Sequence, residues 1–407
     1  MRYISKHMER IPPYMFARIN QMKLHARREG KDVIDLGMGN PDRPTPPHVV
    51  EKLCEVVRDP KSHRYSASSG IPHLRRAIAD WYQRRFGVDL DPENEVVSVI
   101  GSKEGICHLF LAILDEGDLV LVPSPTYPIH YYSVVIAGGH LHTVPLTAEG
   151  NFLPDLSKVA HEVYPRPKVL ILSYPNNPTT QVVDLAFFEE VAEFAKREQI
   201  LIVHDLAYSE ICFDGYRAPS FLQAKGAKEV GVEFYSLSKT YNMAGWRVGF
   251  AVGNRHVIAA LAKLKSYYDY GIFTPIQVAA IDAIRGDQSC VDELNQIYSR
   301  RRDVLVRGLN SLGWNVPLPK ATMYVWAPIP EKYRSLGSMK FAELLLEKAL
   351  VATSPGVGFG TAGEGYLRFA LVENERRIKQ ALRGIRTVMG ANAVSKIGAS
   401  ASTRRKG

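Results

Sequence analysis

The segment SLSKTYNMAGWRVG, residues 236–249, contains one lysine, Lys239, whose neighbours are small, polar or aromatic. Taken alone, this residue would be assigned to the surface, because lysine is rarely buried unless it is paired. Arg247 follows eight residues later in the same segment. A lysine amine whose pKa is lowered by burial and by a neighbouring cation becomes a nucleophile and a general base. Lys239 is therefore a candidate catalytic residue.

Further polar residues follow short apolar runs elsewhere in the chain. Asp205 ends the run ILIVHD, where a carboxylate is costly unless it faces a cation. Ser102 begins an expected helix, and the N–H groups at a helix N-terminus attract phosphate. The whole set comprises Ser102, Lys103, Tyr127, Asn176, Asn177, Asp205, Tyr208, Ser236, Ser238, Lys239 and Arg247.

The chemical groups in this set match one cofactor. Serine hydroxyls and the Arg247 guanidinium can bind a phosphate dianion. Asp205 can pair with a protonated ring nitrogen, and Lys239 can form a bond with an aldehyde carbon. Phosphate, ring nitrogen and aldehyde are the functional groups of pyridoxal 5′-phosphate, which is therefore the expected cofactor.

The elements that must position these residues follow from the hydrophobic pattern. Short apolar runs, such as EVVSVI at 95–100 and KVLIL at 168–172, alternate with helical patterns such as LAFFEEVAEFAKREQ at 185–199. This alternation predicts an α/β fold with a mostly parallel sheet covered by helices on both faces. Such sheets bind ligands beyond the carboxyl ends of their strands, which is where the polar set lies.

The same pattern predicts the domain organisation. We expect a large cofactor-binding domain at 45–285. Residues 1–44 should form an N-terminal arm and part of a small domain, and residues 286–390 should form the rest of this smaller α+β domain, beginning with the amphipathic helix pattern at 290–313. The tail 391–407 is polar and rich in small residues, and we expect it to be disordered.

Composition excludes several classes of protein. The 407 residues are 46% hydrophobic, which is typical of a globular protein. The net charge of +9 is spread along the chain without a recognisable nucleic-acid-binding module, so we expect no nucleic-acid partner. Cys54, Cys107, Cys212 and Cys290 are widely spaced, which is typical of the reducing cytoplasm. No apolar stretch is long enough for a membrane span, and no motif indicates a metal site.

Three motifs in this order and spacing, YPNNPT, HDLAY and SLSKTYNMAGWRVG, resemble those of the class I and II aminotransferases of fold type I. The resemblance extends from about residue 12 to about residue 389. It implies a large domain with a mostly parallel seven-stranded sheet, a smaller α+β domain, and transamination between amino acids and 2-oxo acids with ping-pong kinetics.

The resemblance also implies roles for individual residues. Lys239 would form the Schiff base with the cofactor and carry the proton, and Asp205 would pair with the pyridinium nitrogen. Asn177 and Tyr208 would donate hydrogen bonds to the phenolic oxygen of the ring, and Tyr127 would stack on the ring face.

The substrate and the partner subunit are assigned in the same way. Arg368, in YLRFAL, would bind the substrate α-carboxylate, helped by Asn177 and by the backbone near Gly39. Tyr14 would line the side-chain pocket. Tyr65, in RYSASSG, would reach the phosphate bound by the neighbouring subunit, so the resemblance implies a homodimer with shared active sites.

A narrower resemblance concerns the substrate. The segments MGNPD, GSKEG, HDLAY, SKTYNMAGWR and SYYDYGIFTP look like those of the bacterial glutamate-pyruvate (alanine) aminotransferases. This implies exchange between L-alanine and 2-oxoglutarate. The alternatives are an aminotransferase for aspartate, LL-diaminopimelate or another amino acid, and a pyridoxal phosphate-dependent β C–S lyase. A transcription regulator of the same fold is disfavoured, because only about forty residues precede the PPHVVEKL helix.

Overall fold

The computed structural model describes residues 3–13 and 15–390. The expected pocket residue Tyr14 and the expected disordered tail therefore lie outside the described residues. The chain divides into two compact units, which are described separately below. Unit 1 contains residues 3–12, Asn40–Gln296 and Lys320–Thr322, and unit 2 contains Pro13–Gly39, Ile297–Pro319 and 323–390.

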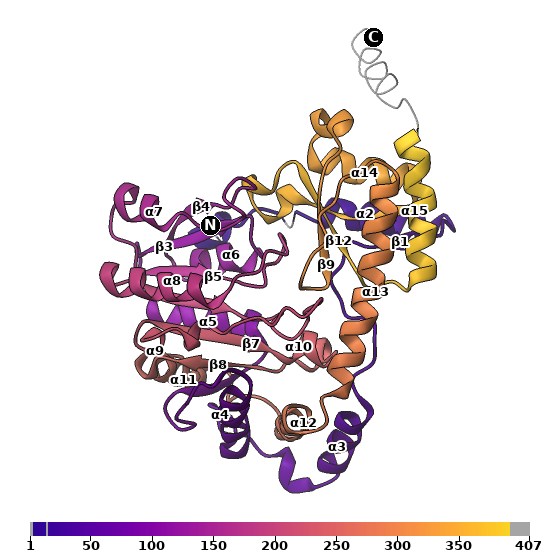
Figure 1. Ribbon diagram of the computed structural model, residues 1–407. Helices are drawn as coiled ribbons and strands as arrows, with labels where there is room; N and C mark the ends of the chain where they lie inside the picture. Colours follow the sequence, from indigo (N-terminus) through magenta and orange to yellow (C-terminus); the bar gives the residue numbers. More distant parts are fainter. Residues whose placement is uncertain (1–2, 14, 391–407) are drawn as a thin grey trace. The chain divides into compact units, whose positions relative to one another are not determined.

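A seven-stranded sheet forms the centre of unit 1 (Figure 1). Its strands lie in the order β2, β8, β7, β6, β5, β3, β4. Their bounds are β2 (Val96–Val99), β3 (Leu119–Ser124), β4 (His140–Pro145), β5 (Val169–Leu172), β6 (Leu201–Asp205), β7 (Gly231–Ser236) and β8 (Gly249–Gly253). Neighbouring strands are parallel except at β8, which is antiparallel to both β2 and β7. The predicted α/β fold with a mostly parallel sheet is confirmed.

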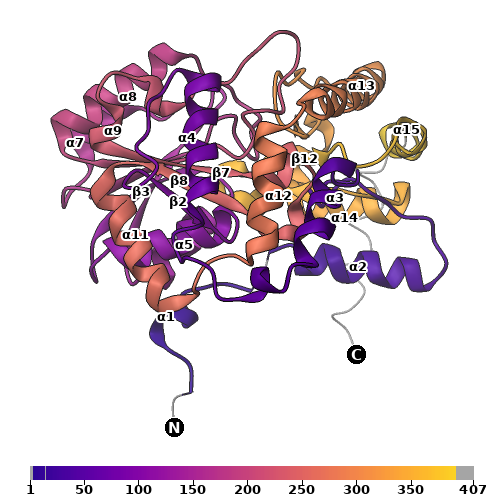
Figure 2. The ribbon, with the colours of Figure 1, turned by 90° about the horizontal axis from the view of Figure 1, so that it is seen from below.

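Helices cover both faces of this sheet. One face packs against α4 (Pro72–Phe86), α8 (Leu185–Glu198) and α12 (Thr274–Arg285), and the other against α5 (Ser102–Ile113), α6 (Ile129–Ile136) and α11 (Arg255–Tyr268). Helices α4 and α12 lie side by side on the first face (Figure 2). Successive residues of a strand pack into the cores on opposite faces of the sheet. Val96 and Ile202 lie in the core on the first face, and Val97 and Val203 lie in the core on the second face. The apolar runs are continuous because both faces are buried.

Side-chain caps and glycines delimit several of these helices. Asp184 accepts a hydrogen bond from the backbone N–H of Phe187 at the start of α8, and Asn254 caps α11 in the same way. Gly87 ends α4 in the left-handed conformation. The shorter helices of unit 1 are α1 (Lys6–Glu9), α3 (Pro47–Val57), α7 (Leu156–Glu162), α9 (Ala227–Val230) and α10 (Leu237–Thr240).

Unit 2 has an α+β architecture with its own core. Its antiparallel sheet has the order β11 (Ser354–Pro355), β12 (Tyr366–Ala370), β9 (Tyr324–Pro328), and a parallel pair joins β1 (Ile34–Asp35) to β10 (Val351–Ala352). The helices are α2 (Ala17–Arg28), α14 (Gly337–Ala349), α15 (Glu375–Gly390) and the C-terminal part of α13 (Ser289–Ser311). Trp314 packs against Phe341 and Phe369 in the core, with ring centroids 5.5 and 5.6 Å away.

The division between the units differs from the expected domain boundaries. It falls at 39/40 and 296/297, whereas the sequence indicated 44/45 and 285/286. The second division lies inside the continuous helix α13, and no glycine or proline lies within ten residues of it in this helix. Residues 3–12 belong to unit 1, where Arg10 Nη2 donates to the carbonyl of Gly139 at 3.1 Å. Within the described part of the chain, no helix is both long and apolar enough to span a bilayer.

Candidate active site

Asp205 ends β6 near the middle of the unit 1 sheet and is 5% exposed. Its Oδ2 lies 3.1 Å from Nε2 of His130, and Nδ1 of the same ring lies 2.7 Å from the Thr126 hydroxyl. If Nε2 carries the proton, His130 donates to Oδ2 of Asp205 and accepts from the Thr126 hydroxyl, so both ring nitrogens have partners. The other oxygen, Oδ1, is buried and has no hydrogen-bond partner among the described residues. This oxygen can accept a hydrogen bond from a ligand.

The turn between β2 and α5 has the features of a phosphate site. Gly101 has φ +83°, which glycine adopts without strain, and a Cβ there would lie 2.3 Å from Nη2 of Arg247. Arg247 donates to the carbonyls of Ala244 at 2.8 Å and Ile100 at 3.3 Å. Its guanidinium thus lies against the turn that precedes Ser102, the first residue of α5. A helix N-terminus beside a guanidinium attracts an anion.

Lys239 lies on α10, the one-turn helix that follows β7. Ser236 caps this helix, because its Oγ accepts a hydrogen bond from the N–H of Ser238 at 3.2 Å. Both serines are buried, whereas the lysine is half-buried. The end of β7 also pairs with the start of β8, where Ser236 lies opposite Gly249. A Cβ at Gly249 would lie 2.6 Å from the carbonyl oxygen of Tyr235 and 3.3 Å from the backbone nitrogen of Ser102, so this glycine lets the start of β8 lie close to β7 and to the α5 turn.

The loop after β5 holds two asparagines. Asn176 is engaged within the loop: its Oδ1 accepts from the N–H and the hydroxyl of Thr179, and its Nδ2 donates to the carbonyl of Ser173. These bonds give Asn176 a structural role. Asn177, the predicted ligand of the ring oxygen, is the next residue and is 5% exposed.

Two tyrosines of the predicted set also follow strand ends of unit 1. Tyr208 comes three residues after Asp205 and is 5% exposed. Tyr127 follows β3, is partly exposed, and meets His130 edge to face at 6.0 Å between ring centroids. Tyr127 is thereby linked through His130 to Asp205, the residue expected to bind the ring nitrogen.

His204 is the residue before Asp205, and its ring packs against Phe188 of α8, with the ring centroids 4.9 Å apart. Its ring is fully buried, with Nδ1 2.7 Å from Oε2 of Glu233. Glu233 also accepts from the hydroxyls of Tyr82 and Ser220. The fully buried carboxylate is compensated by these donors, so His204 belongs to a structural network.

Arg368 lies in unit 2, on β12, and is 7% exposed. Its Nη2 donates to the carbonyl of Gly37 at 3.1 Å, and its Cζ lies 4.0 Å from the ring centroid of Tyr324 and 4.5 Å from that of Phe359. Cation–π contact with two rings fixes the guanidinium. Gly39 is needed beside the same tyrosine, because a Cβ there would lie 2.0 Å from the Tyr324 hydroxyl.

Three predicted residues are exposed: Arg247, described above, and Lys103 and Tyr65. Lys103, the second residue of α5, is exposed. Tyr65 is 89% exposed, and its ring centroid lies 5.3 Å from that of Tyr270. The neighbouring Tyr267 and Tyr268 are exposed as well. An exposed aromatic group of this kind is typical of a surface that contacts another protein.

Sequence reasoning missed three residues of this arrangement. His130 and Thr126 support Asp205, and Tyr324 supports Arg368. The spacing of Thr126 and His130, four residues apart in TYPIH, is compatible with a local contact. No local pattern indicates the partner of His130, because Asp205 lies 75 residues further along the chain.

Comparisons with known proteins agree with this geometry. Residues 31–385 match the family model described as aminotransferase class I and II. The chain is 56% identical to the glutamate-pyruvate aminotransferase AlaC of Escherichia coli, over 95% of this chain and 94% of the relative. It is 51% identical to the LL-diaminopimelate aminotransferase of Moorella thermoacetica, over 95% of this chain and 98% of that relative. Among solved structures, substrate-bound BacF from Bacillus subtilis superposes with a TM-score of 0.90 at 38% identity, over 96% of this chain and 98% of BacF.

Proposed function

This chain belongs to the class I and II aminotransferases, and from that premise we propose that it transfers the amino group between L-alanine and 2-oxoglutarate with pyridoxal 5′-phosphate as cofactor. The products are pyruvate and L-glutamate, and the reaction is reversible. The observation that carries the substrate assignment is the 56% identity, over nearly the whole of both chains, to a glutamate-pyruvate aminotransferase.

Several residues of unit 1 fit the cofactor. Oδ1 of Asp205 is a buried acceptor without a donor among the described residues, and a protonated ring nitrogen is a donor of matching charge. The Gly101 turn, the N-terminus of α5 and the Arg247 guanidinium match a phosphate dianion. Ser102, Lys103, Ser236, Ser238 and Arg247 would hold the phosphate, and Tyr127, Asn177 and Tyr208 would hold the ring.

When bound, pyridoxal 5′-phosphate supplies a carbonyl carbon that bonds with amines and a cationic ring that withdraws electrons from the substrate Cα. Asp205 accepts the hydrogen bond of the ring nitrogen and keeps its proton in place. His130 donates to the other oxygen of Asp205 at 3.1 Å and orients the carboxylate. The negative charge that Asp205 carries at the buried end of β6 is thereby directed at the nitrogen.

Lys239 and Arg368 act on the substrate. The Nζ of Lys239 accepts the proton from the substrate Cα as a general base and later returns it as a general acid. Arg368 binds the α-carboxylate, since a guanidinium matches a carboxylate in bidentate geometry. Its contacts with Tyr324 and Phe359 hold the guanidinium in one orientation before the substrate arrives. The first 2-oxo acid leaves before the second binds, which gives ping-pong kinetics.

We also propose that the enzyme works as a homodimer with shared sites. Tyr65 is 89% exposed and stands beside the exposed Tyr270, so its hydroxyl is accessible to a second copy of the chain. In this proposal it donates a hydrogen bond to the phosphate bound by the partner subunit.

A second substrate class is favoured by a specific observation, the 51% identity to an LL-diaminopimelate aminotransferase. The two substrates differ greatly in the length and charge of the side chain. A side-chain pocket discriminates between substrates by about 1–3 kcal/mol for each methylene by which they differ. We therefore expect the enzyme to prefer one of these two substrates strongly over the other. Aspartate transamination and a β C–S lyase activity are the remaining alternatives.

The test is a panel of amino donors at a fixed concentration of 2-oxoglutarate. We expect kcat/KM to be highest for L-alanine, with 2-aminobutyrate accepted less well. A tenfold preference for LL-diaminopimelate or aspartate would overturn the substrate assignment but not the aminotransferase activity. Release of pyruvate from alkyl-cysteine without any 2-oxo acid would support the lyase.

A further inference from the structure

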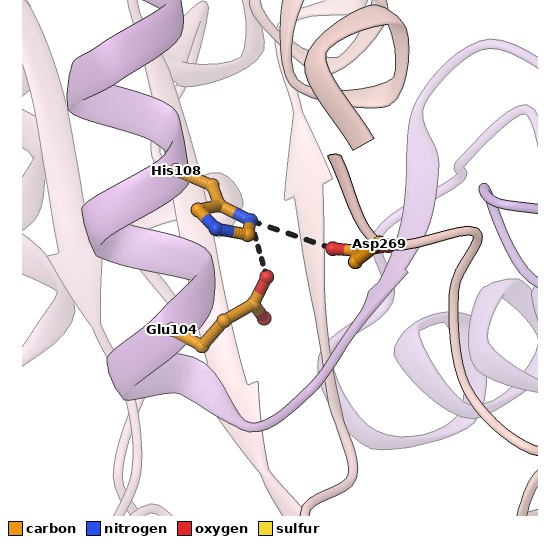
Figure 3. Close-up of side chains that lie close together, drawn as sticks. All are labelled: Glu104, His108 and Asp269. Atoms are coloured by element: carbon orange, nitrogen blue, oxygen red, sulfur yellow. Dashed lines mark ion pairs between the residues drawn. The ribbon is translucent and has the colours of Figure 1, made fainter. Parts of the chain in front are cut away.

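A cluster of charged side chains lies behind the proposed phosphate site in unit 1. Glu104 and His108 project from successive turns of α5, and Asp269 follows the end of α11 (Figure 3). His108 Nδ1 forms an ion pair with Oε1 of Glu104 and lies 3.5 Å from Oδ2 of Asp269. Lys265, which is fully buried on α11, lies 2.9 Å from Oδ2 of Asp269 and 3.7 Å from Oε1 of Glu104.

The three residues drawn in Figure 3 have ligand atoms close enough to share a metal ion. The ammonium of Lys265 already supplies the positive charge in this position, and a divalent ion beside it would be repelled. The cluster is thus a partly buried ion network. Although burial opposes ionisation, hydrogen bonds from Lys265 and from the N–H of Gly271 keep the pKa of Asp269 below its usual value.

This network is connected to the phosphate site by one hydrogen bond. Oε2 of Glu104 accepts from the backbone N–H of Ile100 at 2.7 Å. The carbonyl of the same residue accepts from Nη2 of Arg247 at 3.3 Å. Ile100 is therefore held from both sides, immediately before Gly101, whose φ of +83° redirects the chain into α5. Glu104 occupies the third position of α5, where a carboxylate commonly reaches back to the N–H groups that precede a helix.

The other end of the network holds a second turn. Oδ1 of Asp269 accepts from the N–H of Gly271 at 2.6 Å. Gly271 has φ +84°, and a Cβ there would lie 2.8 Å from the carbonyl of Ala67. This turn lies against the segment that carries Tyr65, whose ring is tilted by 39° to that of Tyr270. The network therefore connects the phosphate turn of one subunit with the segment proposed to reach the partner's phosphate.

We propose that Glu104 is a positioning residue for the cofactor phosphate. It acts through the N–H of Ile100, which sets the Gly101 turn and the position of the Arg247 guanidinium, while Lys265 and His108 hold its carboxylate in place. This inference rests on the proposed function, because it takes the phosphate of pyridoxal 5′-phosphate to lie at the N-terminus of α5.

Two conservative variants separate the reach of Glu104 from its charge. Glu104→Asp keeps the charge beside Lys265 but is one methylene too short to hold the Ile100 N–H. Glu104→Gln loses the charge but keeps an oxygen at the right distance. Glu95 provides a matched control: its carboxylate likewise accepts from a backbone N–H, that of Asp91, and from Lys228, both at 2.9 Å, and it is more deeply buried than that of Glu104. It precedes β2, at the end of the strand opposite the phosphate turn.

The measurement is the dissociation constant of the apoenzyme for pyridoxal 5′-phosphate and for pyridoxal, which lacks the phosphate. For Glu104→Asp we expect the dissociation constant for pyridoxal 5′-phosphate to rise about tenfold, which is the effect of one lost hydrogen bond to a charged group. The dissociation constant for pyridoxal should change less than about twofold. Glu104→Gln should bind both within about threefold of the parent protein. Glu95→Asp should leave both constants unchanged.

Three results would overturn the proposal. The first is an unchanged cofactor affinity in Glu104→Asp; if the loss were then confined to Glu104→Gln, the charge of the side chain rather than its length would matter. The second is an equal loss of affinity for both ligands, and the third is a loss in Glu95→Asp as large as that in Glu104→Asp. If the parent apoenzyme binds no pyridoxal 5′-phosphate, the proposed function itself fails. If the parent binds the cofactor and the variants bind it equally well, only the role of Glu104 fails.

Discussion

Replacing Asp205 by asparagine tests the central electrostatic element of the site. The variant keeps the size of the side chain and an oxygen for the contact with His130, which lies 3.1 Å from Oδ2. It removes the negative charge from a position that is 5% exposed. The ring nitrogen of the proposed cofactor would then lose the anion that holds its proton, and the electron-withdrawing capacity of the ring would fall.

The size of the effect follows from the burial. At an effective dielectric constant of about 20 and a separation of about 3 Å, two opposite charges attract by about 5 kcal/mol. If this stabilisation is lost mainly in the transition state, kcat falls by three to four orders of magnitude. Binding loses less, because a hydrogen bond to a charged group contributes about 1.5–3 kcal/mol net, so the dissociation constant for pyridoxal 5′-phosphate should rise roughly ten- to hundredfold.

The assay compares kcat for L-alanine and 2-oxoglutarate at saturating cofactor with the cofactor affinity of the apoenzyme. Asp184→Asn is a suitable control, because this aspartate only caps α8 at the surface of the same unit. A variant Asp205→Asn that retains the parent kcat and shows only weaker cofactor binding would refute the assigned role.

Two further predictions concern the lysine and the dimer. Lys239→Ala should yield a folded protein that lacks the visible absorbance of a covalently attached cofactor and loses transamination by several orders of magnitude; retention of both would mean that another lysine carries the cofactor. Mixed dimers of Lys239→Ala with an inactive Tyr65 variant should recover part of the activity, because one of their two sites contains both intact residues, and verified mixed dimers without any recovery would contradict the shared site.

Local patterns in the sequence were sufficient to predict the strands and the main chemical groups. The apolar runs that end at Asp205 and at Ser236 became β6 and β7, because a strand buried on both faces needs several consecutive apolar residues. The carboxyl ends of parallel strands meet at one edge of a sheet, so polar residues there could be grouped before any contact was known. The order of the strands and the antiparallel direction of β8 have no such local signature.

The residue pattern was thus enough to infer the α/β sheet, the polar residues at its carboxyl edge and the cofactor chemistry that these residues match. The side chains that support those residues become known only from the folded chain. His130 meets Asp205 across 75 residues, and Glu104 meets Lys265 and Asp269 from a different helix. The physical reason is that buried charges must be compensated by partners in space, and a partner far away in the chain leaves no pattern in the residues around either one.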